Sequence, residues 1–313
     1  MVLAVKMTTE TVPSFDEPVA IFPQDMIPKL LTAFSKSAAV TSEREEVTAL
    51  RTAFYSEVLM YLRSVHPETL DVVDDIQSLM KRILPIKTIS ELAQQIEYFL
   101  ERCVRYRHQL EVLVGKFAFV IGNLNNLAKR TVIEKADLEL SVSEYLEKRR
   151  LTLKEAKILR IRVVLACPLP PLASKIERQA NAKKDLAEEQ QKGVDSLQAA
   201  VSAIEALYTC QCSLYQILDS IARTLVNMTS RLRLVRNSAS DATNLQLPSA
   251  TTDNSFLTLK EEALGVDWGC ETISTTRLDF LAKMVEAGAD RLLTSDFERD
   301  WIGRYQKIKP ITQ

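Results

Sequence analysis

Apolar residues between positions 92 and 127 recur in alternating steps of four and three residues. The ladder comprises Leu92, Ile96, Phe99, Cys103, Tyr106, Leu110, Leu113, Phe117, Val120, Leu124 and Leu127. This spacing is typical of a helix that packs along a neighbouring helix through one seam. No proline lies between Pro85 and Pro168, and Thr88 or Ser90 is a suitable N-cap. We therefore predict one helix over residues 88–150.

A second ladder lies in the proline-free stretch after Pro171. It is weak over residues 174–193, strengthens from Val194, and changes phase between Tyr208 and Leu214. It predicts a second helix over residues 174–236. Two helices of matched length joined by one short connection predict an antiparallel hairpin.

The flanking segments predict further helices and one linker. The expected helices cover residues 26–38, 43–65, 67–84 and 274–308, and the polar run 237–255 reads as a linker. The expected fold is all-α: an elongated helical bundle with a long antiparallel helical hairpin and a small apolar head at its tip. We name three parts: the bundle (1–127 plus 194–313), the coiled-coil neck (128–150 plus 174–193) and the head (151–173).

The head combines apolar and basic residues. Leu159, Ile161 and Val163 alternate with two arginines, a strand-like period, although three prolines follow. Exposed apolar side chains would lower solubility, so the head either packs on itself, folds back onto the bundle, or contacts a membrane or a partner. A membrane surface that carries anionic lipid suits a basic, apolar tip. The candidate contact residues are Leu159, Arg160, Ile161, Arg162, Val163, Val164, Leu165, Leu169 and Leu172.

The composition argues against several classes of function. The 313 residues carry 40 Lys and Arg against 41 Asp and Glu, and this balance argues against a nucleic-acid binder. The chain has two histidines and no nucleotide-binding or metal-binding motif, so we expect no enzyme activity, no cofactor and no metal. Five cysteines without a CxxC motif are expected to be free thiols. We expect no cleavable signal peptide, and no apolar run reaches the length of a membrane span.

The paired helices 88–150 and 174–236, the head between them and the flanking helices resemble the α-helical pore-forming toxins of the cytolysin A-like superfamily. The architecture is most similar to the B component of α-xenorhabdolysin-type binary toxins. The resemblance implies a toxin component that is a soluble monomer before assembly. It then joins a second, A-type subunit in a hetero-oligomeric ring on the target membrane. It also implies secretion without a cleavable signal peptide, and whether this chain or its partner crosses the bilayer stays open.

A second interpretation stays open beside the first. The chain is then a cytoplasmic, intracellular coiled-coil scaffold or tethering protein without membrane-lytic activity. That interpretation predicts a homodimer that forms through the seam at 92–127.

Overall fold

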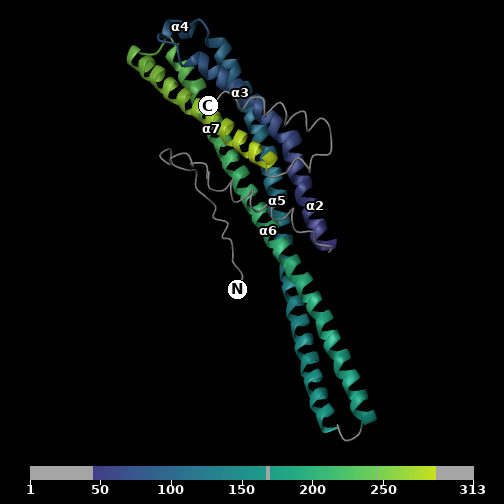
Figure 1. Cartoon of the computed structure of the whole chain (residues 1–313). Coiled ribbons are helices and arrows are strands. Elements are labelled where there is room, and N and C mark those ends of the chain that lie inside the picture. The colour runs from purple at the N-terminus through teal and green to yellow at the C-terminus, as the bar shows by residue number, and fades with distance from the viewer. Residues whose placement is uncertain (1–44, 167–169, 245, 287–313) are drawn as a thin grey trace.

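Two long helices determine the shape of the molecule. The computed structural model describes residues 45–166, 170–244 and 246–286, and all regular elements in these residues are helical. Helix α5 (Ile96–Leu165) and helix α6 (Pro170–Ala242) run antiparallel along nearly their whole lengths (Figure 1). At 1.5 Å per residue they are roughly 105 and 110 Å long. The prediction of an all-α elongated bundle with a long hairpin is confirmed.

The first long helix starts later and ends later than predicted. Thr88 does cap a helix, because its side chain accepts a hydrogen bond from the backbone N–H of Glu91, but this helix is the short α4 (Ile89–Ala93). Gln95 then leaves the helical conformation, with φ −122° and ψ 6°, and α5 begins after it. The helix continues without interruption beyond residue 150 into the predicted head.

The second long helix begins within the proline cluster. Pro170 and Pro171 occupy the first turn of α6, where a helix leaves its N–H groups without intrahelical partners in any case. The prolines therefore start this helix rather than disrupt the segment. At its other end α6 continues beyond the predicted residue 236 to Ala242.

The predicted linker at 237–255 is wrong for most of its length. Helix α7 (Ser249–Glu286) begins inside it, 25 residues before the helix predicted at 274–308, whose described residues 274–286 are helical as predicted. The helix is stable there because an apolar stripe packs against α6 and α3 (Figure 1). Its buried residues are Leu259, Ala263, Val266, Cys270 and Ile273. The Lys260 ammonium group also donates to the carbonyls of Ile83 and Leu84 at the end of α3, each at 2.7 Å.

Helices α2 (Glu45–Met60) and α3 (His66–Ile83) flank the upper part of α5 and are joined by a π-helical segment, Tyr61–Val65. Pro67 explains this widened turn, since proline has no N–H to continue the normal ladder. The N–H of His66 donates instead to the carbonyl of Tyr61, five residues earlier. The apolar stripe predicted for the 43–65 helix is buried: Val47, Leu50, Phe54, Val58 and Tyr61.

The core of the bundle lies where α2, α3 and α7 surround the halves of α5 and α6 that are remote from the tip (Figure 1). Ile96 is partly buried against this core, and the ten other members of the predicted α5 ladder are buried. On α6 the ladder differs at one position, because Tyr208 is 39% exposed and Leu207 is buried. The seam passes through Leu207 and Gln211 to Leu214, so the predicted phase change between Tyr208 and Leu214 is wrong.

The neck is a pair of helices that meet through small side chains. Its buried residues include Thr131 and Leu138 of α5 and Ala180 and Ala187 of α6, and in the adjoining head Thr152 and Ala156 of α5 are buried as well. Small residues allow close approach of two helices but bury much less apolar surface than Leu or Phe. The neck therefore has less packing energy per turn than the bundle.

Some sequence predictions fall on residues outside the described part. These are the helix at 26–38, the segment 287–308 with Trp301, and Cys167 and Leu169 of the head.

We expect substitution of Leu110 by Ala to lower the free energy of unfolding by about 2–5 kcal/mol, because the fully buried side chain leaves a cavity. The matched control is Leu264→Ala on α7, where the leucine is more than half exposed; it should change stability by less than about 0.5 kcal/mol. Urea unfolding followed by circular dichroism measures both. Equal losses for the two variants would contradict the assigned core.

We expect amide hydrogen exchange to be faster in α5 over residues 150–165 than over 106–124, because the distal segment has fewer and smaller buried contacts. Exchange followed by mass spectrometry on peptides of equal length measures the difference. Similar protection in both segments would show that the small-residue neck is as stable as the bundle.

Candidate functional site

The head is the distal end of the helical hairpin. Helix α5 extends through it to Leu165, and α6 begins at Pro170, so only residues 166–169 lie between them. Leu159, Ile161 and Val163 therefore lie in a helix, although their alternation with arginine is typical of a strand. In a helix, Leu159 and Val163 share one face, as residues four apart do, whereas Ile161 projects from another face.

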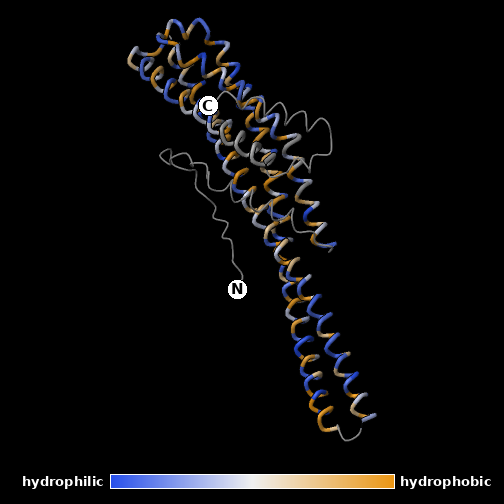
Figure 2. Tube along the Cα trace, in the orientation of Figure 1, coloured by the Kyte–Doolittle hydropathy of each residue, from blue (hydrophilic) through white to orange (hydrophobic). Residues whose placement is uncertain are grey.

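The described apolar residues of the head divide into two groups. Leu159 and Val163 are half-buried. Ile161, Val164, Leu165 and Leu172 are exposed, with 73% of Val164 and 75% of Leu165 accessible to solvent. These residues belong to the ends of α5 and α6 opposite the bundle, and the end of α5 is coloured as hydrophobic there (Figure 2). The described residues of the head thus do not fold back onto the bundle.

Positive charge surrounds the exposed apolar residues. Residues 157–184 contain seven basic side chains against one acidic side chain, Glu177. The basic residues are Lys157, Arg160, Arg162, Lys175, Arg178, Lys183 and Lys184. Arg160 and Arg162 are exposed and form no ion pair with any residue that the structure describes. The tip therefore presents cationic groups together with an apolar surface.

Ion pairs between the two helices lie farther from the tip. Lys183 pairs with Glu155 at 2.7 Å, and Lys135 pairs with Glu205 at 2.8 Å. The hydrogen bond to Glu205 raises the pKa of Lys135. Each pair joins α5 to α6 and matches the antiparallel register, although exposed pairs contribute little stability. The outermost cations are left free to contact another surface.

Sequence reasoning missed an apolar stripe on the outer face of α5, which we call the outer seam. It consists of Ile133, Leu140, Leu151, Ile158 and Leu165. All five side chains are exposed, and at 100° per residue they lie within about 40° of one another around the helix. The signal in the sequence is their spacing of 7, 11, 7 and 7 residues, which the broader apolar content of the region obscured.

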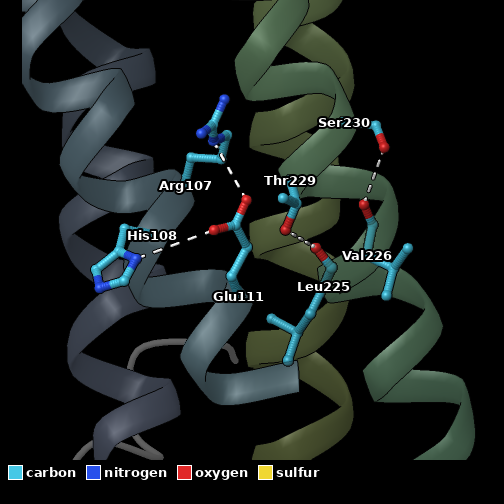
Figure 3. A network of polar contacts seen from close by, with 7 residues as sticks. All are labelled: Arg107, His108, Glu111, Leu225, Val226, Thr229 and Ser230. Carbon is cyan, nitrogen blue, oxygen red and sulfur yellow. Dashed lines mark hydrogen bonds and ion pairs between the residues drawn. The ribbon is translucent and has the colours of Figure 1, made fainter. Parts of the chain in front are cut away.

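The network of polar groups around Glu111 consists of contacts within single helices of the described bundle. Figure 3 shows Glu111 with Arg107 at 3.3 Å and with His108 at 3.9 Å, all on one turn of α5. On the neighbouring α6, the hydroxyl of Thr229 donates to the carbonyl of Leu225, four residues earlier, so it serves its own helix.

Two buried thiols of the described chain are unsuited to nucleophilic chemistry. Burial raises the pKa of Cys103 to about 12, and burial also raises the pKa of Cys270. Thiols with such raised pKa values are poor nucleophiles. Among the described residues, no three His, Cys, Asp or Glu side chains are grouped to hold a metal ion. Likewise, no described helix is apolar over enough of its length to span a bilayer.

Comparison with known proteins gives matches in structure alone. No protein-family model and no curated protein sequence matches this chain. The soluble AhlC of the tripartite alpha-pore-forming toxin AHL from Aeromonas hydrophila superposes with a TM-score of 0.60 at 7% identity, over 82% of this chain and 96% of that chain. The triple head mutant of AhlC superposes with a TM-score of 0.64 at 6% identity, over 79% of this chain and 96% of that chain. XaxA from Xenorhabdus nematophila superposes with a TM-score of 0.51 at 12% identity, over 85% of this chain and 99% of that chain.

These likenesses extend over nearly the full length of the other chains, so they include both the bundle and the hairpin. Because the sequence identities are only 6–12%, the similarity concerns the fold alone. The architectural resemblance expected from the sequence is therefore confirmed: the chain has the fold of α-pore-forming toxin subunits.

Proposed function

We propose that this protein is a component of an α-helical pore-forming toxin, and that its head binds the target membrane. The observation that carries the proposal is the exposed apolar, cationic tip on a hairpin that holds it far from the bundle. The fold supports the same class, since soluble AhlC belongs to a tripartite alpha-pore-forming toxin.

Two favourable free energies add when the tip meets a membrane: the transfer of apolar side chains out of water, and the attraction of basic side chains to anionic lipid. Transfer of one Leu or Val side chain out of water is worth roughly 1.5–3 kcal/mol. Each Lys or Arg near a surface of anionic lipid adds about 1 kcal/mol. Val164 and Leu165 supply the first contribution, and Arg160 and Arg162 supply the second. A binding site of this kind needs no span of the bilayer by this chain, because it lies at the interface.

The proposal includes partners and a place of action. The chain acts outside the cell that makes it, at the membrane of a target cell. On the target membrane it joins a second, A-type toxin subunit in a hetero-oligomeric ring. In this assembly the long hairpin serves as the rod that places the head on the lipid while the bundle stays in water. Lipid and protein are its partners, and it needs no cofactor.

The scaffold interpretation receives no support from the packing. It requires a homodimer through the seam at 92–127, but Leu110, Leu113 and Phe117 of this seam are fully buried within the chain. A second copy cannot reach them without unfolding the bundle. No observation on the described residues favours this second function.

We expect the double substitution Val164→Asp and Leu165→Asp to reduce binding to liposomes by at least 100-fold, because two carboxylates replace apolar side chains at the lipid interface. Co-sedimentation with liposomes of mixed phosphatidylcholine and phosphatidylserine measures binding. The control is Leu257→Asp, which changes an exposed leucine on α7 in the bundle. Unchanged binding of the head variant would contradict the proposal.

Arg160→Gln with Arg162→Gln is expected to weaken binding to the same anionic liposomes about 30-fold, from about 1 kcal/mol for each lost charge. On pure phosphatidylcholine the loss should nearly vanish, and added salt should reduce it. Arg105→Gln with Arg233→Gln removes two exposed charges from the bundle and serves as the control. A loss that is the same on both lipids would show that the arginines act on folding rather than on charge.

A further inference from the structure

We propose that residues 301–309, near the C-terminus, dock on the outward side of α7 in the same chain and cover an exposed apolar stripe there. We call this stripe the α7 face, and it consists of Leu257, Leu264 and Trp268. The docked segment is a removable cover on the bundle. The inference goes beyond the proposed function, because it concerns neither the head nor a membrane.

The α7 face is apolar where a surface helix is normally polar. Its three side chains are all exposed, and at 100° per residue they lie within about 40° of one another around α7. The buried residues Ala263 and Val266 lie on the other side of the helix, which packs against α6 and α3. Exposed apolar residues that gather on one face mark a contact surface.

The charges around the α7 face are mostly negative. Residues 249–273 carry five acidic side chains and one basic side chain, Lys260. The Lys260 ammonium group donates to the carbonyls of Ile83 and Leu84, so it is directed to α3 rather than to the α7 face. An occupant of this face therefore needs apolar residues at helical spacing together with basic residues. The acidic residues are Asp253, Glu261, Glu262, Asp267 and Glu271.

Asp267 indicates a missing hydrogen-bond donor next to Trp268. Its Oδ1 atom is buried and accepts no hydrogen bond from any described residue. The carboxylate also forms no ion pair with a described residue. A buried carboxylate oxygen without a donor is costly, so a donor from another part of the chain would stabilise it.

The C-terminal segment has the complementary pattern. Trp301, Tyr305 and Ile308 follow one another in steps of four and three, so in a helix they share one face. Residues 301–309 carry three basic side chains and no acidic side chain. The basic residues are Arg304, Lys307 and Lys309.

The chain between α7 and this segment is long enough for the contact. Trp268 lies 18 residues, or about 27 Å of helix, before Glu286, the last described residue. Residues 287–300 number 14, and an extended chain of this length spans up to about 46 Å. The segment can therefore return along α7 in the antiparallel direction. Residues 26–38 are also apolar and basic, but they lead into α2, which packs mainly on α5 and α6.

One antiparallel register matches the apolar positions. With Trp301 opposite Trp268, Tyr305 is opposite Leu264, because the members of each pair lie four residues farther along their own helix. Ile308 then lies at the height of residue 261, midway between Leu264 and Leu257. The apolar side chains of the segment thus cover the length of the α7 face.

The charges fit the same register. In an antiparallel helix pair, side chains turned to the same side of the contact line meet one another. Glu261 is turned about 40° to one side of the α7 face, and Lys309, turned about 80° to the same side, lies one residue away in height. Asp267 is turned to the other side, as is Arg304, which lies two residues away in height. Arg304 thereby supplies the donor that Asp267 lacks.

The short connection makes a weak contact sufficient. A tether of this length keeps the segment near the α7 face at a local concentration in the millimolar range. A contact too weak to join two separate molecules then forms within one chain. In urea the segment leaves before the bundle unfolds, so substitutions on the α7 face change docking and hardly change the unfolding of the bundle.

Disulfide cross-linking tests the register. In a background with Cys167→Ser and Cys212→Ser, the variant Leu264→Cys with Tyr305→Cys should form a disulfide within one chain under mild oxidation. Digestion and mass spectrometry identify the joined peptides, and a denaturing gel shows whether the product is a monomer. The control, Val226→Cys with Tyr305→Cys, uses an exposed residue of α6 and should not cross-link. A missing cross-link, or a covalent dimer in its place, would overturn the proposal.

Quenching of tryptophan fluorescence by acrylamide tests the cover in the full chain and without lipid. In the Trp301→Phe variant Trp268 is the only tryptophan, and Tyr305→Asp with Ile308→Asp should raise its quenching severalfold. The control, Thr294→Asp with Ser295→Asp, adds the same charge between α7 and the segment and should leave quenching unchanged. Circular dichroism confirms that each variant folds. Equal quenching in all these variants would refute the proposal, whether or not the head binds liposomes.

A charge exchange tests the docked orientation in the same assay. Glu261→Lys or Lys309→Glu alone should weaken docking by up to about fivefold, the upper limit for an exposed ion pair. The two changes together should restore the protection of Trp268, because they rebuild the pair with reversed charges. Double and single variants with equally exposed Trp268 would contradict the register.

Discussion

The antiparallel pairing of α5 and α6 determines nearly everything else in this molecule. In the bundle the pairing is made by large side chains such as Leu110 and Phe117, and three further helices cover it. Towards the tip it is made by Ala156, Ala180 and Ala187, and no other described helix covers it. One continuous pair of helices thereby gives a stable body at one end and a slender, weakly packed rod at the other.

The sequence predicted this pairing because both helices carry a long, uninterrupted ladder of apolar residues, and such a ladder depends only on local spacing. It did not predict the first part of α7, residues 249–273. There the buried positions from Leu259 to Ile273 follow the same steps of four and three, but Ser, Thr and Asn dominate the segment just before them. Those polar residues lie in a helix because packing against α3 and α6 outweighs their weak helical preference. That contact could not be inferred from the local sequence.

The head was located correctly from the sequence, but its conformation was not. Two arginines that alternate with Leu159, Ile161 and Val163 give a period of two over a few residues, which is too short to separate strand from helix. The helix of residues 96–150 continues through the segment, and the prolines after it begin α6. The exposed face of the head was predictable only once the helix was known, because Ile161 and Leu165 then fall on the side opposite α6.

A rod of two helices has a geometric limit that the bundle does not have. Each helix can bury only one stripe against the other, so an apolar residue elsewhere on its circumference meets solvent. Ile133, Leu140 and Ile158 are such residues, and neither the stability nor the solubility of the neck requires them. In the bundle, apolar residues outside one seam are explained by a third helix. In the neck no third helix of the described chain is present, so the apolar residues of its outer face are exposed to solvent.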